Sequence, residues 1–186
     1  MDRESCQAAW NDGDRPGFVF FWGHTPKVAG VVDHCCFSQW WHAPFTDGVD
    51  GGVTYPTTEH WMMAHKARTF GDDDALARVL QAETPAEAKA IGRTVRGFVK
   101  ETWSEVCFDV VVAGNLAKFS QHKELAAILE ATGGKILVEA SPVDPIWGIG
   151  LAADDPRALD PSTWRGQNLL GFALVEVRER LRQPAT

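Results

Sequence analysis

Two short apolar runs frame a long stretch of helical pattern in this chain of 186 residues. Residues 17–22 and 135–140 have continuously apolar centres, which is typical of strands buried inside a domain. Between and after them, apolar residues recur at helical spacing and are interrupted by glycine and proline, the usual signals of helix ends. We therefore expect helices over residues 57–69, 72–82, 85–92, 100–119, 123–131 and 168–181.

Local capping signals support these helices. The segment Thr84-Pro85-Ala86-Glu87 combines a capping box with proline at the first helical position, and Asn168 is suited to cap the last helix. The sequence predicts an α+β fold that is predominantly helical, with few short strands in one compact domain. That domain is expected to span residues 17–182, behind a loose polar segment at residues 1–16.

Two long connections separate these elements. Residues 24–56 and 141–166 are rich in turn-forming residues, yet both also contain tryptophan. Loops of this length are uncommon inside a compact domain unless they serve a function. We expect both connections to contribute to a binding site.

Composition and charge narrow the class of protein. The chain is 45% hydrophobic and 23% charged, which is ordinary for a globular protein and excludes wholesale disorder. Its net charge of −7 does not suit a protein that coats nucleic-acid duplexes without specificity. No apolar run reaches the length of about 18 residues that a transmembrane helix needs, and the first residues lack the pattern of a signal peptide. We therefore expect a cytoplasmic protein with no membrane partner.

The cysteines and histidines suggest no metal centre. Cys35 is adjacent to Cys36, no CxxC spacing occurs, and reduced thiols are the simplest interpretation. A site made from His34, Cys35, Cys36 and His42 would match no zinc-binding spacing. No glycine-rich phosphate loop of the GxGxxG type is present. The sequence predicts neither a metal nor a cofactor.

One predicted helix carries a candidate pair of reactive groups. Glu59 and Lys66 are seven positions apart, so a helix places them on one face two turns apart. Glu59 falls in the first turn, where the helix dipole favours a carboxylate. The alternative is a solvated helix with a weak stripe of charge.

A second candidate lies in the loop after the second apolar run. Asp144 precedes a proline and is therefore biased toward extended backbone, while Gly148 allows close approach to a ligand. Trp147, like Trp103 in a predicted helix, could stack on a nucleobase. The alternatives are an ordinary turn for the loop and core packing for the two tryptophans.

Phosphate recognition has two further candidates. The predicted helix N-terminus at Asn168 would offer free backbone N–H groups to an anion. Arg93 and Arg96 could pair with phosphate oxygens. The alternatives are that Asn168 is only a cap, that Gly171 is only a packing notch, and that both arginines are simply solvated.

Taken together, these segments resemble the NADAR family, which includes the N-glycosidases of the YbiA type. The resemblance extends over nearly the whole chain, and it rests on the number, order and spacing of motifs rather than on one of them. The motifs are Phe20-Phe21-Trp22-Gly23, Phe37-Ser38-Gln39-Trp40, Thr58-Glu59-His60-Trp61, Lys66-Ala67, Ala88-Lys89-Ala90-Ile91-Gly92-Arg93, Lys118-Phe119, Leu137-Val138-Glu139-Ala140, Asp144-Pro145-Ile146-Trp147-Gly148-Ile149-Gly150 and Asn168-Leu169-Leu170-Gly171.

This resemblance implies a hydrolase that cleaves the bond between ribose C1′ and a nitrogen. The family's catalytic positions fall on Glu59, Trp103 and Asp144, and its helix lysine falls on Lys66. Members of the YbiA type can carry an acid where this chain has Ile149. We take Glu59, Lys66 and Asp144 as catalytic candidates. The substrate-binding candidates are Phe21, Ser38, Arg93, Trp103, Trp147, Gly148 and Asn168.

The resemblance implies two classes of substrate. We expect ADP-ribosylated guanine, as a nucleotide or in DNA, because an acidic chain is better suited to an exposed base than to long duplex contacts. The alternative substrates are the ribosylamino-pyrimidine phosphates of early riboflavin synthesis. A different class of function, a non-catalytic module that binds ADP-ribose or a nucleotide, would use the same tryptophans without needing the catalytic groups.

The chemistry allows two routes. A carboxylate can stabilise the positive sugar while a proton donor serves the leaving base, and Glu59 and Asp144 are the natural pair. Alternatively, a neutral Lys66 amine attacks C1′ and forms a Schiff base, which requires a dry pocket that lowers the lysine pKa. A nearby Glu59 would raise that pKa and make Lys66 a charged clamp instead. We expect covalent participation of Lys66.

Overall fold

The two apolar runs pair as parallel strands in the computed structural model, which describes residues 1–48 and 52–183. Strand β1 (Phe18–Phe21) lies beside β4 (Ile136–Glu139), with Phe18 opposite Ile136 and Phe21 opposite Glu139. Parallel strands need a long crossover connection, and here the connection includes a whole helical unit. The chain forms two compact units, residues 1–38 with 124–186 and residues 39–123.

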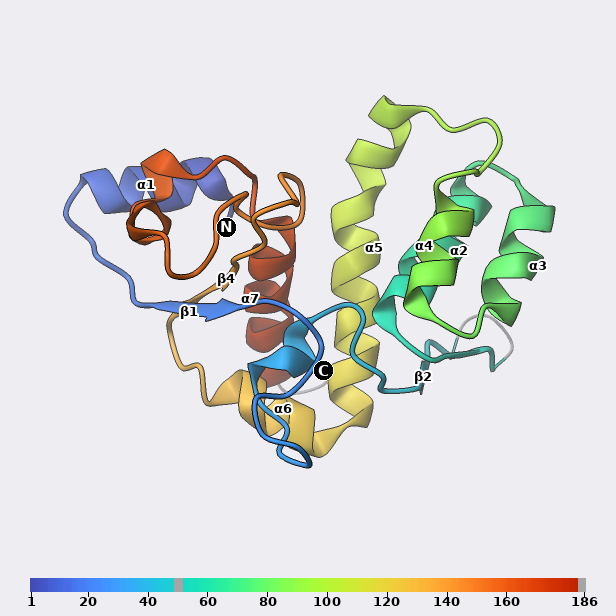
Figure 1. The fold of residues 1–186 in the computed structure, drawn as a ribbon, viewed down its shortest axis with the longest axis horizontal. Helices are drawn as coiled ribbons and strands as arrows, with labels where there is room; N and C mark the ends of the chain where they lie inside the picture. The colour runs from blue at the N-terminus through green and yellow to red at the C-terminus, as the bar shows by residue number, and fades with distance from the viewer. Residues whose placement is uncertain (49–51, 184–186) are drawn as a thin grey trace. The chain divides into compact units, whose positions relative to one another are not determined.

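The first unit is built around β1, β4 and the last helix. Helix α7 (Leu169–Arg182) packs along β4, and the short helix α6 (Lys123–Glu130) precedes that strand (Figure 1). Among its described residues, this unit also contains three short 3-10 helices. They are η1 (His34–Phe37), η2 (Pro156–Leu159) and η3 (Pro161–Thr163).

The contact between α7 and β4 is unusually close because Gly171 has no side chain. A Cβ atom at Gly171 would lie 2.1 Å from the carbonyl oxygen of Leu137. Asn168, at the start of α7, donates from Nδ2 to the Leu137 carbonyl and accepts the Glu139 N–H at Oδ1, each at 2.9 Å. The side-chain amide of Asn168 therefore connects the start of α7 to β4 by two hydrogen bonds.

Asn168 does not act as the predicted helix cap. It occupies the N-cap position in the left-handed region, with φ at 56°, and its side chain makes no capping hydrogen bond. The prediction of a side-chain cap was wrong because the oxygen and the nitrogen of the Asn168 amide both hydrogen-bond to the backbone of β4 instead. Asparagine tolerates this backbone conformation better than most residues.

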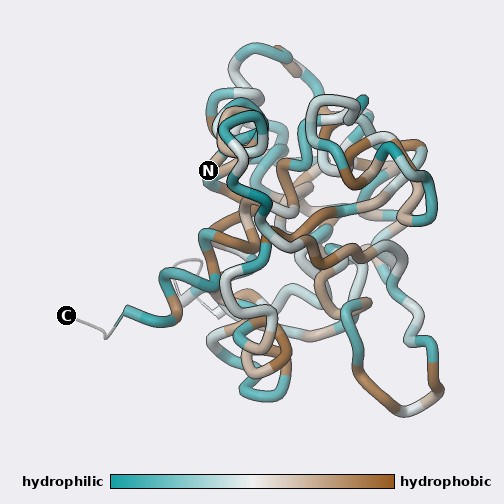
Figure 2. The backbone as a smooth tube through the Cα atoms, turned by 90° about the vertical axis from the view of Figure 1, so that its left-hand side faces the viewer, coloured by the Kyte–Doolittle hydropathy of each residue, from teal (hydrophilic) through white to brown (hydrophobic). Residues whose placement is uncertain are grey.

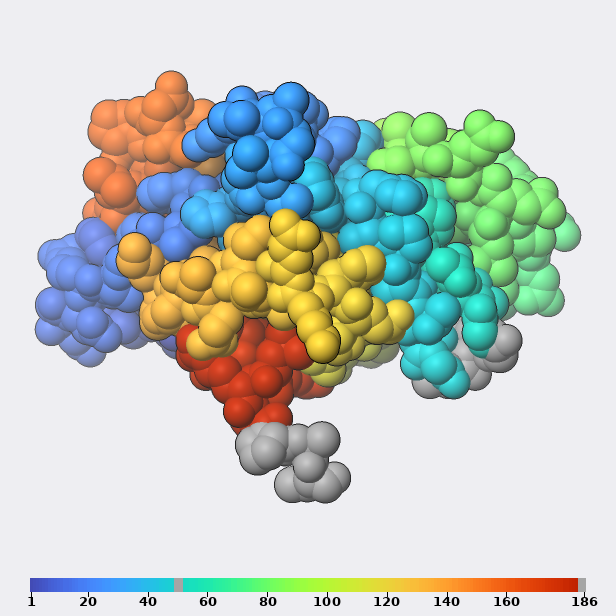
Figure 3. All heavy atoms as spheres, turned by 90° about the horizontal axis from the view of Figure 1, so that it is seen from below, coloured from blue at the N-terminus to red at the C-terminus, as the bar shows by residue number. Residues whose placement is uncertain are grey.

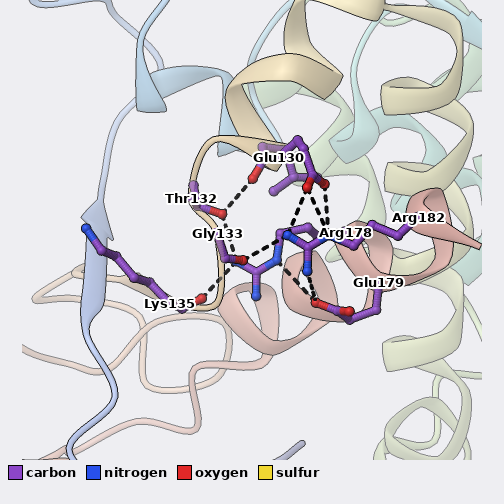
Figure 4. A network of polar contacts seen from close by, with 8 residues as sticks. Glu130, Thr132, Gly133, Lys135, Arg178, Glu179 and Arg182 are labelled. Carbon is purple, nitrogen blue, oxygen red and sulfur yellow. Dashed lines mark hydrogen bonds and ion pairs between the residues drawn. The ribbon is translucent and has the colours of Figure 1, made fainter.

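The C-terminal end of α7 is fastened by arginines. Arg178, which is 2% exposed, donates from Nη1 to Thr132 Oγ1 at 2.7 Å and to the Lys135 carbonyl at 2.8 Å (Figure 4). Arg182 contacts the Glu130 carboxylate at 3.0 Å and the Gly133 carbonyl at 3.1 Å. Figure 3 shows the end of α7 in red directly beside α6 in yellow. These contacts connect α7 to the turn between α6 and β4.

The N-terminal segment differs from the expected loose chain. Helix α1 (Arg3–Asn11) begins at a reciprocal capping box between Asp2 and Ser5, and it buries Cys6. Trp10 stacks on Phe18 of β1 with ring centroids 5.7 Å apart. Residues 3–11 are therefore helical, supported by this cap, by the buried Cys6 and by the half-buried Trp10.

In the part of the second unit that the structure describes, four helices form a cluster. They are α2 (Thr58–Thr69), α3 (Asp73–Gln81), α4 (Pro85–Gly92) and α5 (Lys100–Gln121). Helix α2 packs against each of the other three. The two-residue strands β2 (Phe45–Thr46) and β3 (Thr54–Tyr55) form a short antiparallel pair beside them.

Trp61 fills the centre of this second unit. It is 5% exposed, meets Tyr55 edge-on at 5.1 Å, and donates from Nε1 to the Val110 carbonyl at 2.7 Å. A Cβ atom at Gly114 of α5 would lie only 2.4 Å from this indole. The small residue in α5 therefore allows α2 and α5 to approach each other.

The predicted fold class, a predominantly helical α+β protein with few short strands, is confirmed. Along the helices, Figure 2 shows brown and teal segments in alternation, as expected when one face is buried. Thr84 caps α4 as predicted, although Glu87 accepts from the Glu83 N–H rather than completing the box at Thr84. Within the described residues, no helix is long and apolar enough to cross a membrane.

Candidate active site

Helix α2 presents Glu59 and Lys66 two turns apart, as their spacing predicts. Glu59 is 2% exposed and Lys66 is half-buried. Most of the helix is buried, including Thr58, Trp61 and the residues between them. The alternative of a solvated helix with a stripe of charge is therefore wrong.

The first turn of α2 is fixed by two kinds of contact. Thr57 caps the helix by accepting from the His60 N–H. The carbonyl of Gln39 then accepts both the Glu59 N–H, at 3.0 Å, and the Thr58 hydroxyl, at 3.2 Å. The backbone that carries Glu59 is therefore held from both sides. The positive end of the helix dipole lies at this turn and favours a carboxylate there.

Lys66 lies in surroundings that disfavour its charged form. Burial is the main cause that lowers the pKa of Lys66, and the positive charge of Arg93 lowers it further. Its Nζ atom lies 4.1 Å from the ring centroid of Phe98. Of the two opposing influences expected at this lysine, the dry environment prevails. A larger neutral fraction makes an amine a better nucleophile at neutral pH.

The two arginines considered for phosphate binding differ. Arg93 is exposed at the C-terminal end of α4, and its charge acts on Lys66. Arg96 instead pairs with Asp72 at 2.6 Å and Asp74 at 2.8 Å. The Arg96 side chain and N–H hold the pKa of Asp72 at about 2. Only Arg93 stays a candidate for phosphate, because Arg96 is engaged in structural pairs.

Trp103 lies in the first turn of α5 and is half-buried, and its backbone N–H donates to the Val99 carbonyl at 3.1 Å. Helix α2, which carries Lys66, packs against both α4, which ends next to Arg93, and α5, which carries Trp103. Trp103 is not sealed in the core. The second unit thus holds Glu59 and Lys66 on α2, and Arg93 and Trp103 at the two helices that pack against α2.

In the first unit, Asp144 shapes the loop that follows β4. Its Oδ1 atom accepts the N–H groups of Ile146 and Trp147, each at 2.9 Å. This turn is typical of an aspartate that hydrogen-bonds to the backbone just after it. The carboxylate is partly exposed and Trp147 is half-buried, so neither is sealed in the core.

Gly148 and Ile149 are packed inside the first unit. A Cβ atom at Gly148 would lie 2.8 Å from the Glu139 carbonyl, so the missing side chain serves the chain's own packing. The structure gives Gly148 this packing role, and its contact with a ligand stays a prediction. Ile149 is fully buried, and its N–H donates to the same carbonyl at 2.9 Å.

The start of α7 is not an anion site. The N–H groups of Gln167, Asn168, Leu169 and Leu170 donate to carbonyls of residues 145–148. The Asn168 side chain is fully buried and bonded to β4 at both ends. The N–H groups at this helix start are therefore satisfied within the fold, and a substrate contact of Asn168 stays a prediction.

The remaining predicted residues lie at the edge of β1 and η1. Phe21 is 5% exposed and packs edge-on against Phe37 at 5.5 Å, which is a core position. Ser38 is partly exposed at the end of η1. The described residues contain no group of three metal-binding side chains, and His34, Cys35, Cys36 and His42 form none. Burial raises the pKa of the Cys35 thiol to about 11.

Comparison with known proteins shows which family the chain belongs to. Residues 20–182 match the NADAR domain. The protein belongs to the NADAR family. N-glycosidase R617 of Acanthamoeba polyphaga mimivirus is 41% identical over 168 residues, which is 89% of this chain and 97% of that protein. N-glycosidase YbiA of Escherichia coli K12 is 34% identical over 130 residues, which is 70% of this chain and 72% of that protein.

The similarity extends to a solved structure and to a plant protein. The NMR structure of E. coli YbiA matches this chain with a TM-score of 0.70 and 29% identity. The match covers 90% of this chain and 86% of the YbiA chain. The chloroplastic riboflavin biosynthesis protein PYRR of Zea mays is 36% identical over 137 residues, which is 69% of this chain but 20% of that protein. Together these relatives make this NADAR protein a hydrolase that acts on N-glycosyl bonds.

Proposed function

We propose that this NADAR protein removes ADP-ribose from ADP-ribosylated guanine, in a nucleotide or in DNA, by hydrolysing the bond between ribose C1′ and the base. The observation that carries the proposal is the pair on α2, a buried Glu59 and a Lys66 whose pKa is lowered by burial. A module that only binds nucleotides has no need of such a pair. The burial of an aliphatic Ile149, where YbiA-type members can carry an acid, favours a substrate other than the riboflavin precursors.

In the proposed reaction, the neutral Lys66 amine is the nucleophile. Nζ forms a bond to C1′ while the C1′–N bond breaks, and the leaving base takes that electron pair and a proton. Nζ loses a proton, the C1′–O4′ bond opens, and protonated O4′ leaves a Schiff base between C1′ and Nζ. Water then adds to C1′, the C1′–Nζ bond breaks, and the released aldehyde closes to ADP-ribose.

Carboxylates supply the remaining chemistry. Positive charge develops on the sugar and negative charge on the base as the bond breaks, so one group must stabilise the first and another must protonate the second. Glu59 and Asp144 are proposed for these roles. Trp103 and Trp147 are proposed to stack on the bases, and Arg93 to pair with the diphosphate.

Cleavage of ribosylamino-pyrimidine phosphates is the second candidate function, and the similarity to the maize riboflavin biosynthesis protein favours it. The two substrates share the ribose C1′–N bond and differ in the base and in the number of phosphates. The same catalytic groups would serve both, so the choice depends on which base and phosphate are accepted.

Purified protein incubated with each substrate will distinguish these candidates. We expect release of unmodified guanine nucleotide from ADP-ribosylated guanosine phosphate, with kcat/KM at least about tenfold above that for the ribosylamino-pyrimidine phosphate, a difference of about 1.4 kcal/mol. Chromatography coupled to mass spectrometry measures both products. The reverse preference would support the riboflavin-type activity, and tight nucleotide binding without release from either substrate would support a binding module.

A further inference from the structure

Phe98 covers the amine of Lys66 from a different part of the second unit. Phe98 belongs to residues 93–99, which connect α4 to α5 (Figure 1). Its ring centroid is 4.1 Å from Lys66 Nζ, whereas the amines of Lys118 and Lys89 lie 5.0 and 5.7 Å from their nearest aromatic rings. Lys66 therefore has the closest of these contacts between a lysine and a ring.

The connection that carries Phe98 is anchored immediately before it. Asp72, at the start of α3, accepts the Arg96 N–H at 2.8 Å and the Arg96 guanidinium at 2.6 Å. Gly97 follows with φ at +70°, a conformation that favours glycine, and turns the chain. On its other side, the Phe98 ring meets Phe70 edge-to-face at 5.3 Å. These contacts hold Phe98 in place even though it lies at the surface.

The exposure of Phe98 shows that core packing does not account for its position. Its side chain is 44% exposed, so much of its apolar surface contributes nothing to the hydrophobic core. The position of this exposed ring is nevertheless fixed by the anchored backbone before it and by its edge-to-face contact with Phe70. A fixed, exposed aromatic residue over a lysine amine is better explained by its effect on that lysine.

We propose that Phe98 is a positioning residue, which holds the Lys66 amine in the orientation needed for attack and keeps water from one side of it. This inference rests on the proposed function of Lys66. The face of an aromatic ring attracts a cation, while the volume that the ring occupies excludes water and disfavours the charge. These two effects on the charged amine oppose each other, and the volume of the ring also limits where the neutral amine can lie. Arg93 is the charged group that acts with burial to favour the neutral form.

The test uses variants that separate the effect of the aromatic ring from the effect of side-chain bulk. Phe98→Leu removes the aromatic face, Phe98→Tyr keeps it, and Leu80→Ala is a control that shortens another exposed apolar side chain, 42% exposed on α3. Lysine amines are labelled with ¹³C-methyl groups by reductive methylation, and the Lys66 signal is assigned by its loss in Lys66→Arg. Kinetic constants are measured with unlabelled protein on ADP-ribosylated guanosine phosphate.

We expect the methyl signal of Lys66 to lie upfield because of the ring current of Phe98. The upfield position should be lost in Phe98→Leu and kept in Phe98→Tyr and Leu80→Ala. In Phe98→Leu, kcat should fall about 10- to 100-fold with KM nearly unchanged, because a misplaced reacting group costs turnover rather than binding. Phe98→Tyr should keep kcat within about threefold of the native value, a difference under about 0.7 kcal/mol.

Two outcomes would overturn the inference. One is a Lys66 signal in the native protein with no upfield shift. The other is a native kcat in Phe98→Leu despite loss of that shift, which would make the contact incidental. A native protein that shows the shifted signal but cleaves neither substrate would refute the proposed function itself, because the signal reports the contact independently of turnover.

Discussion

Replacing Glu59 with glutamine is expected to reduce kcat by about 10²- to 10⁴-fold, the usual contribution of a carboxylate that transfers a proton or stabilises charge in the transition state. Glutamine matches the size of glutamate, so α2 and its fixed first turn should be kept. Affinity for ADP-ribose should change little, because charge at C1′ develops only as the bond breaks.

The measurement is steady-state turnover together with calorimetric binding of ADP-ribose. Glu87→Gln is a matched control, since Glu87 lies in the first turn of the neighbouring helix α4 but is exposed. The control should retain native turnover. Turnover of Glu59→Gln within about threefold of the native value would show that this carboxylate has no part in the chemistry.

Replacing Gly171 with alanine is expected to destabilise the fold by about 2–4 kcal/mol, although alanine is normally the better helix former. The new Cβ would lie 2.1 Å from the Leu137 carbonyl and 2.5 Å from the Asn168 amide. The Leu137 carbonyl belongs to the backbone of β4, so it cannot move away from the new Cβ as a flexible side chain could. The substitution would therefore separate α7 from β4 and break the two hydrogen bonds of Asn168.

Urea denaturation followed by circular dichroism measures this change. Gly134→Ala is the control, because Gly134 has no atom within 4 Å of its added Cβ and does not have a positive φ. We expect the control to unfold within about 0.5 kcal/mol of the native protein. Native stability in Gly171→Ala would contradict the close packing of α7 on β4.

Helix positions were predictable because their signals are local. Pro85 and the Thr84 cap mark the start of α4, and the spacing of Glu59 and Lys66 places them on one face of α2. The same local signals mark the two apolar strands, although their parallel pairing emerges only from the structure. Such features depend on neighbours a few residues apart in the chain.

What the sequence could not predict depends on contacts between distant residues. Nothing near Asn168 indicates that its amide binds β4 rather than capping α7, because its partners lie about 30 positions away. Arg96 pairs with Asp72 from 24 positions away, which removes it from phosphate binding. The role inferred for Phe98 likewise depends on a contact with Lys66, which no motif of either segment signals.

The burial of Lys66 had the largest consequence for function. From the sequence, a dry pocket and the charge of Glu59 were opposing influences of unknown size. In the structure, burial and Arg93 lower the pKa of Lys66. The stabilisation of its neutral form supports the nucleophilic role over that of a charged clamp.

Borohydride trapping tests the central claim, that Lys66 attacks C1′, more directly than any other measurement. Native protein is mixed with ADP-ribosylated guanosine phosphate and borohydride, and peptide mass spectrometry locates the reduced adduct. Lys66→Arg keeps a long basic side chain but cannot form a Schiff base, and Lys89→Arg removes another lysine that lies near an aromatic ring. We predict an ADP-ribose adduct on Lys66 in the native protein and in Lys89→Arg, and none in Lys66→Arg. Equal adduct yields in the native protein and Lys66→Arg would contradict covalent catalysis by this lysine.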